Sequence, residues 1–238
     1  MQKSMLRILS LADLLSISNG LFGFFSIIIL LSNTVSDISL RIHISFSLIL
    51  LGLLADGLDG IVARRFGKSE IGEYLESMAD VTTLVIAPSI FVYFIYLELV
   101  TINISKHIYL LFAIFLFVFF GFVRLASFSI MKEKKLFVGL PASVSTIIIL
   151  VLSYVKIEFL LILPAVVIIG AAMASNLTFP KPNRYIDSIA AFLILLSIIF
   201  GSFFYNIFPI FLLSGIFIYS ILGPFLKEFF TKKQQKGF

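Results

Sequence analysis

Long apolar runs separated by short polar breaks are the main pattern along this chain of 238 residues. Each run is about 20 residues long, the length that an α-helix needs to cross the hydrocarbon core of a bilayer. The pattern predicts an all-α integral membrane protein, a bundle of about eight transmembrane helices. These helices are expected near residues 11–32, 41–65, 72–98, 107–131, 139–155, 158–176, 185–204 and 207–230. Because the fifth and sixth are short and closely spaced, six or seven spans are the alternative.

The composition supports lipid as the surrounding solvent. Hydrophobic residues make up 60% of the chain and charged residues 13%, whereas an average soluble domain has roughly 25% charged residues. The chain has no cysteine, which excludes disulfides, thiolate metal sites and a cysteine nucleophile. No soluble domain, long polar linker or repeat interrupts the pattern. We therefore expect one transmembrane domain over 1–238, in which 231–238 form a loose cytoplasmic tail.

The basic residues predict how the chain lies in the cell membrane. Of the 18 Lys and Arg residues, only Arg41, Lys106 and Lys156 fall on one set of alternate connections. Since cytoplasmic loops carry the excess of Lys and Arg, both termini are expected in the cytoplasm. The first apolar run follows Lys3 and Arg7 as in a secretory signal, but it is too long for one, so we expect a retained span. Topology also explains the net charge of +5, and we expect no nucleic-acid partner.

Four acidic residues break the apolar pattern where the second predicted helix ends and the third begins. They are Asp56, Asp59, Glu76 and Asp80. Asp56 and Asp59 share one helix face, and Glu76 and Asp80 are one turn apart on the next helix. Two antiparallel helices joined by a short loop bring the four carboxylates toward one another at the cytoplasmic end of the membrane.

Carboxylates in this setting need a cation. An aspartate well inside a span costs about 2.5–3.5 kcal/mol on insertion scales, and neighbouring carboxylates repel one another. Oxygen ligands alone favour Mg²⁺ or Mn²⁺, and Ca²⁺ is an alternative in vitro. The alternative to a metal site is that small residues mark helix packing and the acids pair with nearby arginines. For Arg65, Lys68 and Glu70 we expect only such interface pairing.

Small and basic residues share the face of Asp56 and Asp59. Gly60 and Ala63 remove side-chain bulk there, so that backbone and metal can approach a nucleotide diphosphate closely. Arg64 follows near the headgroup level, where its guanidinium can hold a phosphate through two parallel hydrogen bonds.

This segment resembles the signature of the CDP-alcohol phosphatidyltransferase family, D-x-x-D-G-x-x-A-R followed after seven or eight residues by G-x-x-x-D-x-x-x-D. The motif positions are filled by Asp56, Asp59, Gly60, Ala63, Arg64, Gly72 and Asp80. Glu76 stands where the family has its third aspartate; it keeps the charge and adds one methylene. The resemblance implies that the four acids coordinate one or two metals and that Asp80 is also the catalytic general base.

Further segments are similar to the phosphatidylserine synthase branch of this family. They are Arg124 to Phe128, Phe137 to Ser143, Met173 to Asn176, and the pattern of Asp13, Ser16, Asn19 and Gly23 in the first predicted helix. Two positions depart from that branch, since Ser127 replaces an arginine and Ser143 a proline. The resemblance implies a six-helix core with two further helices at the carboxyl end, and a homodimer by analogy.

The resemblance also assigns candidate binding residues. For the CDP-lipid they are Asn19, Ser16, Asp13, Gly60, Ala63, Arg64 and Gly72; for the acceptor they are Arg124, Gly139, Leu140, Pro141 and Asn176. The alternative for Ser16 and Asp13 is a bond to their own backbone or to a neighbouring helix. The alternative for Arg124 is a structural arginine that extends to the membrane interface.

The expected reaction moves a phosphatidyl or archaetidyl group from CDP-diacylglycerol or CDP-archaeol in the bilayer to the hydroxyl of L-serine, and releases CMP. One alternative is the same chemistry with glycerol 3-phosphate or an inositol phosphate, which would need further basic residues such as Arg184. A cation or proton transporter is the alternative from a different class. It predicts acids spread across the membrane depth, whereas these acids crowd at one end.

Overall fold

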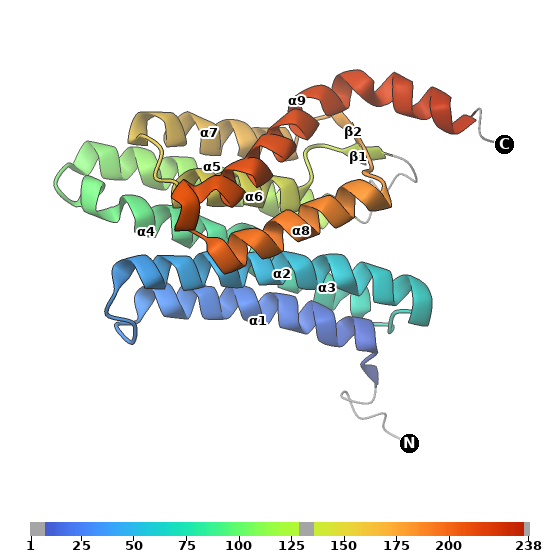
Figure 1. Ribbon diagram of the computed structural model, residues 1–238, viewed down its shortest axis with the longest axis horizontal. Helices are drawn as coiled ribbons and strands as arrows, with labels where there is room; N and C mark the ends of the chain where they lie inside the picture. Colours follow the sequence, from blue (N-terminus) through green and yellow to red (C-terminus); the bar gives the residue numbers. More distant parts are fainter. Residues whose placement is uncertain (1–7, 129–135, 236–238) are drawn as a thin grey trace. The chain divides into compact units, whose positions relative to one another are not determined.

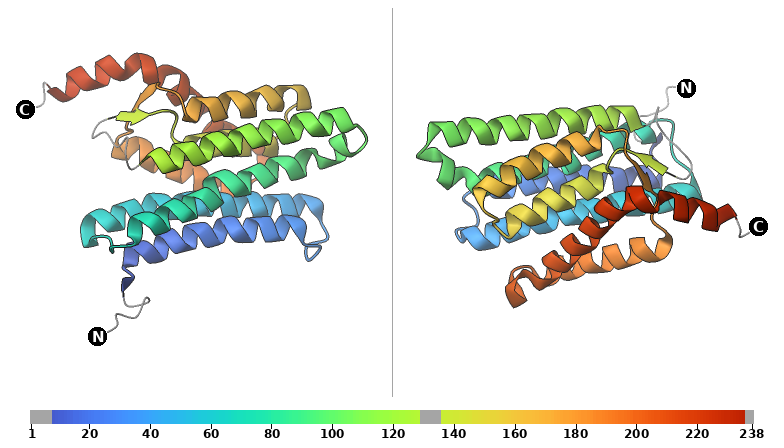
Figure 2. Two further views of the ribbon diagram at one scale, coloured as in Figure 1. Left: turned by 180° about the vertical axis from the view of Figure 1, so that it is seen from behind. Right: turned by 90° about the horizontal axis from the view of Figure 1, so that it is seen from above.

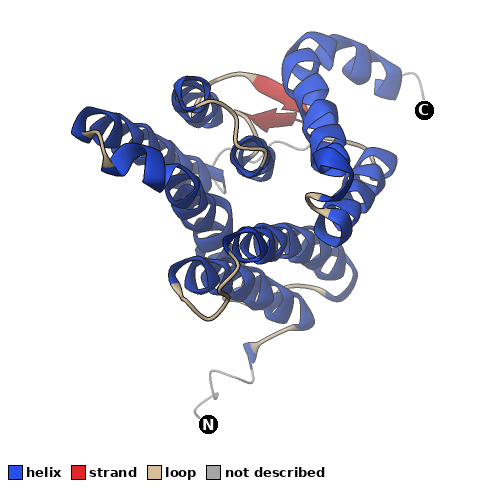
Figure 3. Cartoon of the chain, turned by 60° about the vertical axis from the view of Figure 1, so that its left-hand side comes forward, coloured by secondary structure: helices blue, strands red, loops and turns tan. Residues whose placement is uncertain are grey.

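The computed structural model describes residues 8–128 and 136–235, and this part of the chain is almost entirely helical (Figure 3). The predicted all-α fold is confirmed. Each of the eight predicted helices has a counterpart in these residues, with boundaries that differ by a few residues. The third is divided into α3, a π-helix and α4, which follow one another as a continuous helix.

The helices have the following bounds. They are α1 (Leu11–Leu31), α2 (Ile38–Phe66), α3 (Gly72–Asp80), the π-helix η2 (Val81–Ile86), α4 (Ala87–Thr101), α5 (Ile104–Phe128), α6 (Ala142–Tyr154), α7 (Phe159–Met173), α8 (Arg184–Phe200), the 3₁₀ helix η3 (Phe203–Asn206) and α9 (Ile207–Gln235).

Five helices among the described residues are long and apolar enough to cross a membrane. They are Leu11–Leu31, Ile38–Phe66, Gly72–Thr101, Ile104–Ser127 and Phe203–Pro224. The chain is therefore a multi-pass membrane protein. Helices α6 and α7 are apolar but shorter; a helix of 13 residues such as α6 spans only about 20 Å of the roughly 30 Å hydrocarbon core. The count of eight crossings stays a prediction.

The chain forms two compact units, Met1–Phe94 and Ile95–Phe238, and the single domain over 1–238 also stays a prediction. In the first unit, α1 packs along α2 and against α3 and η2 (Figure 1). A capping box between Ser10 and Asp13 begins α1, which satisfies backbone amides that an open helix end leaves unpaired. Helix α2 ends at Phe66, and the next residue, Gly67, has a φ of +85° that starts the turn into α3.

Two glycines allow the helices of the first unit to meet closely at Thr83. A Cβ atom on Gly23 of α1 would lie 2.8 Å from the Thr83 Cα, and one on Gly52 of α2 would lie 2.5 Å from its Cγ2. Neither position has room for a side chain. Thr83 lies in η2, just after Asp80, and a π-helix inside an α-helix is frequently found at functional sites.

In the second unit, α5 packs on α7, α6 lies against α7 and α9, and α8 pairs with α9 (Figure 2). Two short strands, β1 (Leu136–Val138) and β2 (Thr178–Pro180), form an antiparallel pair in which Phe137 is opposite Phe179. This β-ribbon was not predicted, because three-residue strands are too short to show an alternating pattern. The Tyr219 hydroxyl on α9 donates a 3.0 Å hydrogen bond to the Pro180 carbonyl.

Helix α9 continues to Gln235, beyond the predicted end at residue 230, so most of the predicted loose tail is helical. The polar residues after residue 230 include Lys and Gln, which are good helix formers. Lys3, Arg7, the predicted end of the fourth helix at 129–131 and the last three residues lie outside the described residues.

Candidate active site

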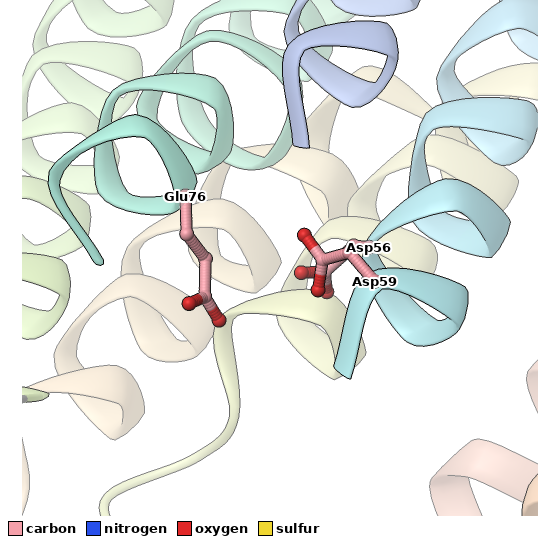
Figure 4. A group of neighbouring side chains, drawn as sticks. All are labelled: Asp56, Asp59 and Glu76. Atoms are coloured by element: carbon pink, nitrogen blue, oxygen red, sulfur yellow. The ribbon is translucent and has the colours of Figure 1, made fainter. Parts of the chain in front are cut away.

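Three carboxylates from two helices converge in the first unit. Asp56 and Asp59 on α2 and Glu76 on α3 place one oxygen each within 4.8 Å of one another (Figure 4). Asp56 and Asp59 are three residues apart on one helix and therefore share a face. The turn at Gly67 returns the chain so that α3 presents Glu76 to the same space. The predicted convergence of the acids is thus observed for these three residues.

Asp80 belongs to the same group but lies outside this 4.8 Å cluster. It is close enough to the three carboxylates for their negative charges to repel its own. Its Oδ1 accepts a 2.9 Å hydrogen bond from the Nδ2 of Asn19 on α1. The fourth acid is therefore fixed by a residue of the first helix.

The donor set fits a hard divalent cation. Asp59 is buried, with 1% of its surface exposed, and its Oδ2 accepts a 2.5 Å hydrogen bond from the Ser16 hydroxyl. Its other oxygen, Oδ1, is buried and has no hydrogen-bond partner among the described residues. A buried carboxylate oxygen without a partner is costly. Mg²⁺ and Mn²⁺ prefer oxygen donors, so these residues are suited to hold such an ion.

Lys68, in the turn between α2 and α3, forms an ion pair with Glu76. Burial opposes the charged form, but the hydrogen bond and charge of Glu76 outweigh it and raise the pKa of Lys68 above its usual 10.5. The sequence predicted that Lys68 takes part in interface pairing, but not that its partner is a candidate metal ligand. A metal ion held by Glu76 would therefore compete with Lys68 for the same carboxylate.

The remaining residues predicted to bind the CDP-lipid lie around this acidic group. Asp13 accepts a 2.7 Å hydrogen bond from the Ser10 backbone amide, so it caps α1, which is the alternative expected for it. Its Oδ1 would lie 2.6 Å from a Cβ on Gly72, which has no room for a side chain. Arg64 is exposed, and its Nη1 lies over Gly60, 3.5 Å from where a Cβ would stand. Ala63 is half-buried beside them on α2.

The predicted acceptor residues lie in the second unit and are joined by backbone hydrogen bonds. Buried Arg124 on α5 donates from Nε to the Leu140 carbonyl at 3.4 Å, and the Leu140 amide donates to the Ala172 carbonyl at 2.9 Å. Gly139 has a φ of +75° and its amide donates to the Leu177 carbonyl at 2.6 Å. Its Cβ would lie 3.1 Å from the Met173 carbonyl carbon, so only glycine fits.

Pro141 is the residue before α6, and Asn176 is exposed in the connection from α7 to β2. Backbone hydrogen bonds therefore hold the loop 139–141 against the end of α7, although the two segments are about 30 residues apart in the sequence.

Sequence reasoning missed Thr83, Lys68 as the partner of Glu76, and Tyr219. Thr83 reads as an ordinary polar residue of an apolar helix. The sequence feature that could have indicated it is the pair Gly23 and Gly52 in other helices, because glycine in a transmembrane helix lets a neighbouring helix pack closely.

Comparisons with known proteins agree with the motif. The family described as CDP-alcohol phosphatidyltransferase matches residues 9–201. A CDP-diacylglycerol–serine O-phosphatidyltransferase of Methanocaldococcus jannaschii is 33% identical over 157 residues, which cover 65% of this chain and 73% of that protein. Its namesake in Helicobacter pylori is 34% identical over 168 residues, covering 64% of this chain and 68% of that protein.

An archaetidylserine synthase of Methanothermobacter thermautotrophicus is also similar, 31% identical over 149 residues that cover 61% of this chain and 58% of that protein. The matched region contains all four acids and extends from the start of α1 to the end of α8. The chain belongs to the CDP-alcohol phosphatidyltransferase family.

Proposed function

We propose that this protein transfers a phosphatidyl or archaetidyl group from a CDP-alcohol lipid to the hydroxyl of L-serine and releases CMP. Membership of the family supports the CDP-alcohol donor. The relatives named as serine transferases and as archaetidylserine synthase support serine as the acceptor. The observation that carries the proposal is the convergence of Asp56, Asp59 and Glu76 within 4.8 Å.

The four acids would hold Mg²⁺ or Mn²⁺, as one or two ions, with Asp80 as the fourth ligand. A bound divalent ion neutralises the charge of the diphosphate and stabilises the phosphate of the departing CMP. The unpartnered Oδ1 of Asp59 supports this assignment. Ca²⁺ is an ion that the same oxygen ligands would accept in vitro.

Asp80 would act as the general base. The serine oxygen attacks the lipid-bearing phosphorus and forms a new P–O bond, while the P–O bond to the CMP phosphate breaks and its electron pair leaves with CMP. The serine proton passes to an Asp80 carboxylate oxygen. Because an alcohol has a pKa far above 7, the positioning of the two reactants contributes more than the base itself.

The CDP-lipid would lie with its tails in the bilayer and its diphosphate at the acidic face of α2. Gly60 and Ala63 leave space for the diphosphate beside Asp56 and Asp59, and exposed Arg64 would hold a phosphate. Gly72 would keep the start of α3 clear of side-chain bulk. Both CDP-diacylglycerol and CDP-archaeol present the same headgroup to these residues.

Arg124 would pair with the serine carboxylate, and the loop Gly139, Leu140 and Pro141, with Asn176, would surround the amino acid. Buried arginine is suited to a carboxylate because its guanidinium is always charged and binds in a fixed fork. Both termini and the active site would face the cytoplasm, as the distribution of basic residues predicts. A single transmembrane domain and a homodimer complete the proposal.

The reaction is tested with the purified full chain in detergent, a CDP-lipid, Mn²⁺ or Mg²⁺, and labelled serine. We expect CMP release and labelled lipid in equal amounts, with CDP-diacylglycerol and CDP-archaeol compared as donors. Glycerol 3-phosphate and inositol phosphate replace serine in parallel reactions. CMP release with one of these but not with serine would reject serine as the acceptor. Absence of CMP release with every acceptor, together with cation flux in vesicles, would favour a transporter.

A further inference from the structure

The contact between Asn19 and Asp80 suggests a role for Asn19 that differs from nucleotide binding. Asn19 lies in the middle of α1 with 0% of its surface exposed. Its Nδ2 donates a 2.9 Å hydrogen bond to the Asp80 Oδ1. A carboxylate accepts hydrogen bonds and does not donate them when charged, so the amide must present its NH₂ group to Asp80. The side chain is therefore already committed to the candidate base.

Thr83 holds the same asparagine at a second point. Its Oγ1 donates a 2.7 Å hydrogen bond to the Asn19 backbone carbonyl, and Thr83 is also 0% exposed. Asp80 and Thr83 belong to one helix at the point where α3 becomes η2. One short segment therefore contacts both the side chain and the backbone of Asn19, and a residue fixed at two points has little freedom to move away from Asp80.

The oxygen of the Asn19 side chain is buried as well. This Oδ1 lies 3.1 Å from where a Cβ on Gly52 would stand, and has no hydrogen-bond partner among the described residues. If the amide turned over, its oxygen would face the Asp80 carboxylate and the hydrogen bond would be lost. The unpaired oxygen is therefore the cost of keeping the NH₂ group on Asp80.

We propose that Asn19 is a positioning residue for Asp80, and that Thr83 in turn fixes Asn19. Asn19 holds the Asp80 Oδ1, so that the other carboxylate oxygen is oriented toward the acidic group and the serine hydroxyl. The role in catalysis rests on the proposed function, whereas the effect of Asn19 on the acidic group itself does not.

The test compares Asn19→Ala, Thr83→Val and the double variant with Ser18→Ala. Ser18 is the matched control because it lies on the same helix, is only partly buried, and its hydroxyl donates to the Leu14 carbonyl at 2.8 Å. The kcat and the KM for both substrates are measured at saturating Mn²⁺. Calorimetry gives the affinities for CMP and for Mn²⁺. Thermal unfolding shows whether each variant is folded.

We expect Asn19→Ala to lower kcat by about 10- to 100-fold, the usual loss when the partner of a metal ligand is removed. The same substitution should also lower the affinity for Mn²⁺. CMP affinity should equal that of Ser18→Ala. Thr83→Val should lower kcat by less, and should cause no further loss when Asn19 is already alanine, because both changes act on one interaction. A purely structural effect would instead lower stability and leave kcat of the folded fraction unchanged.

Two results would overturn the proposal. The first is a kcat and a Mn²⁺ affinity of Asn19→Ala that equal those of Ser18→Ala. The second is a loss of CMP affinity with kcat unchanged, which would make Asn19 a nucleotide contact. If Asn19→Ala does not fold, the isosteric Thr83→Val decides by the same readouts. If the unmodified chain makes no lipid from serine, the proposed function fails, and the Mn²⁺ affinities still decide whether Asn19 positions Asp80.

Discussion

The hydroxyl of Ser16 on α1 donates a 2.5 Å hydrogen bond to the Asp59 Oδ2 on α2, across 43 residues of sequence. Both residues are buried, with 2% and 1% of their surfaces exposed. The bond fixes the rotation of the Asp59 carboxylate, so that Oδ1 remains for a cation. A partner of this kind orients a metal ligand without touching the metal.

Replacing Ser16 by alanine should weaken metal binding. The change removes the hydrogen bond to the Oδ2 of buried Asp59. Mn²⁺ affinity should therefore fall by about tenfold, within the range seen for such partners. Calorimetric titration of Mn²⁺ into the purified protein measures it. Ser18→Ala is the control, and equal affinities for the two variants would show that Ser16 does not orient Asp59.

Removing the charge of Lys68 should have the opposite effect. In Lys68→Met no ammonium competes for Glu76, and Mn²⁺ affinity should rise by up to about fivefold, since partly exposed ion pairs are worth about 0.2–1 kcal/mol. The raised pKa keeps Lys68 charged below pH 10.5, so the competition is present throughout the neutral range.

Arg65→Met is the matched control for this experiment. It removes the same charge three residues away, from a side chain that lies over the Phe66 ring at 5.5 Å. The same titration is used for both variants. If Mn²⁺ affinity rises as much in Arg65→Met as in Lys68→Met, the gain comes from the change in net charge and not from the ion pair between Lys68 and Glu76.

Two glycines of α2 should respond differently to alanine. In Gly52→Ala the new Cβ would stand 2.5 Å from the Thr83 Cγ2, and such overpacking typically costs about 1–3 kcal/mol. At Gly57 nothing lies within 4 Å of the new Cβ, so the higher helix propensity of alanine should stabilise α2 by up to about 1 kcal/mol. Thermal unfolding in one detergent compares them. A Gly52→Ala protein as stable as Gly57→Ala would contradict the close packing at Thr83.

The sequence was sufficient to predict the elements that depend on local pattern. The eight helices follow from apolar runs, and the convergence of Asp56, Asp59 and Glu76 follows from helix periodicity and a short turn. The pattern predicts that the second helix begins at residue 41, whereas α2 begins at Ile38. In the structure, Asp37 caps the helix by accepting from the Ser39 amide.

Contacts between distant residues could not be predicted in this way. The bonds from Asn19 to Asp80 and from Thr83 to Asn19 cross 61 and 64 residues, and hydrophobic periodicity carries no information on such pairs. Asn19 and Ser16 were assigned to the nucleotide from a resemblance, and their contacts with two acids appear only when the helices are packed. The β-ribbon was missed for the same reason, since its strands are too short for a local signal.

The Tyr219 hydroxyl should influence the proposed acceptor site through the β-ribbon. It donates to the Pro180 carbonyl of β2, β2 pairs with β1, and β1 leads directly into Gly139. In Tyr219→Phe the KM for serine should rise by about two- to tenfold, the range expected for one neutral hydrogen bond, while the KM for the CDP-lipid stays the same. Tyr205→Phe, at a residue that is 95% exposed, is the control. An equal rise in both KM values would indicate a general loss of structure instead.

The most direct test of the central claim is the rate of CMP release from a CDP-lipid by Asp59→Asn in the presence of Mn²⁺ and serine. This substitution keeps the size of the side chain and its capacity to accept from Ser16, and removes the negative charge that binds a cation. If the carboxylates hold the metal that the reaction needs, CMP release falls to the background rate while the protein remains folded. Turnover equal to that of the unmodified protein would contradict the assignment of the metal site and the mechanism built on it.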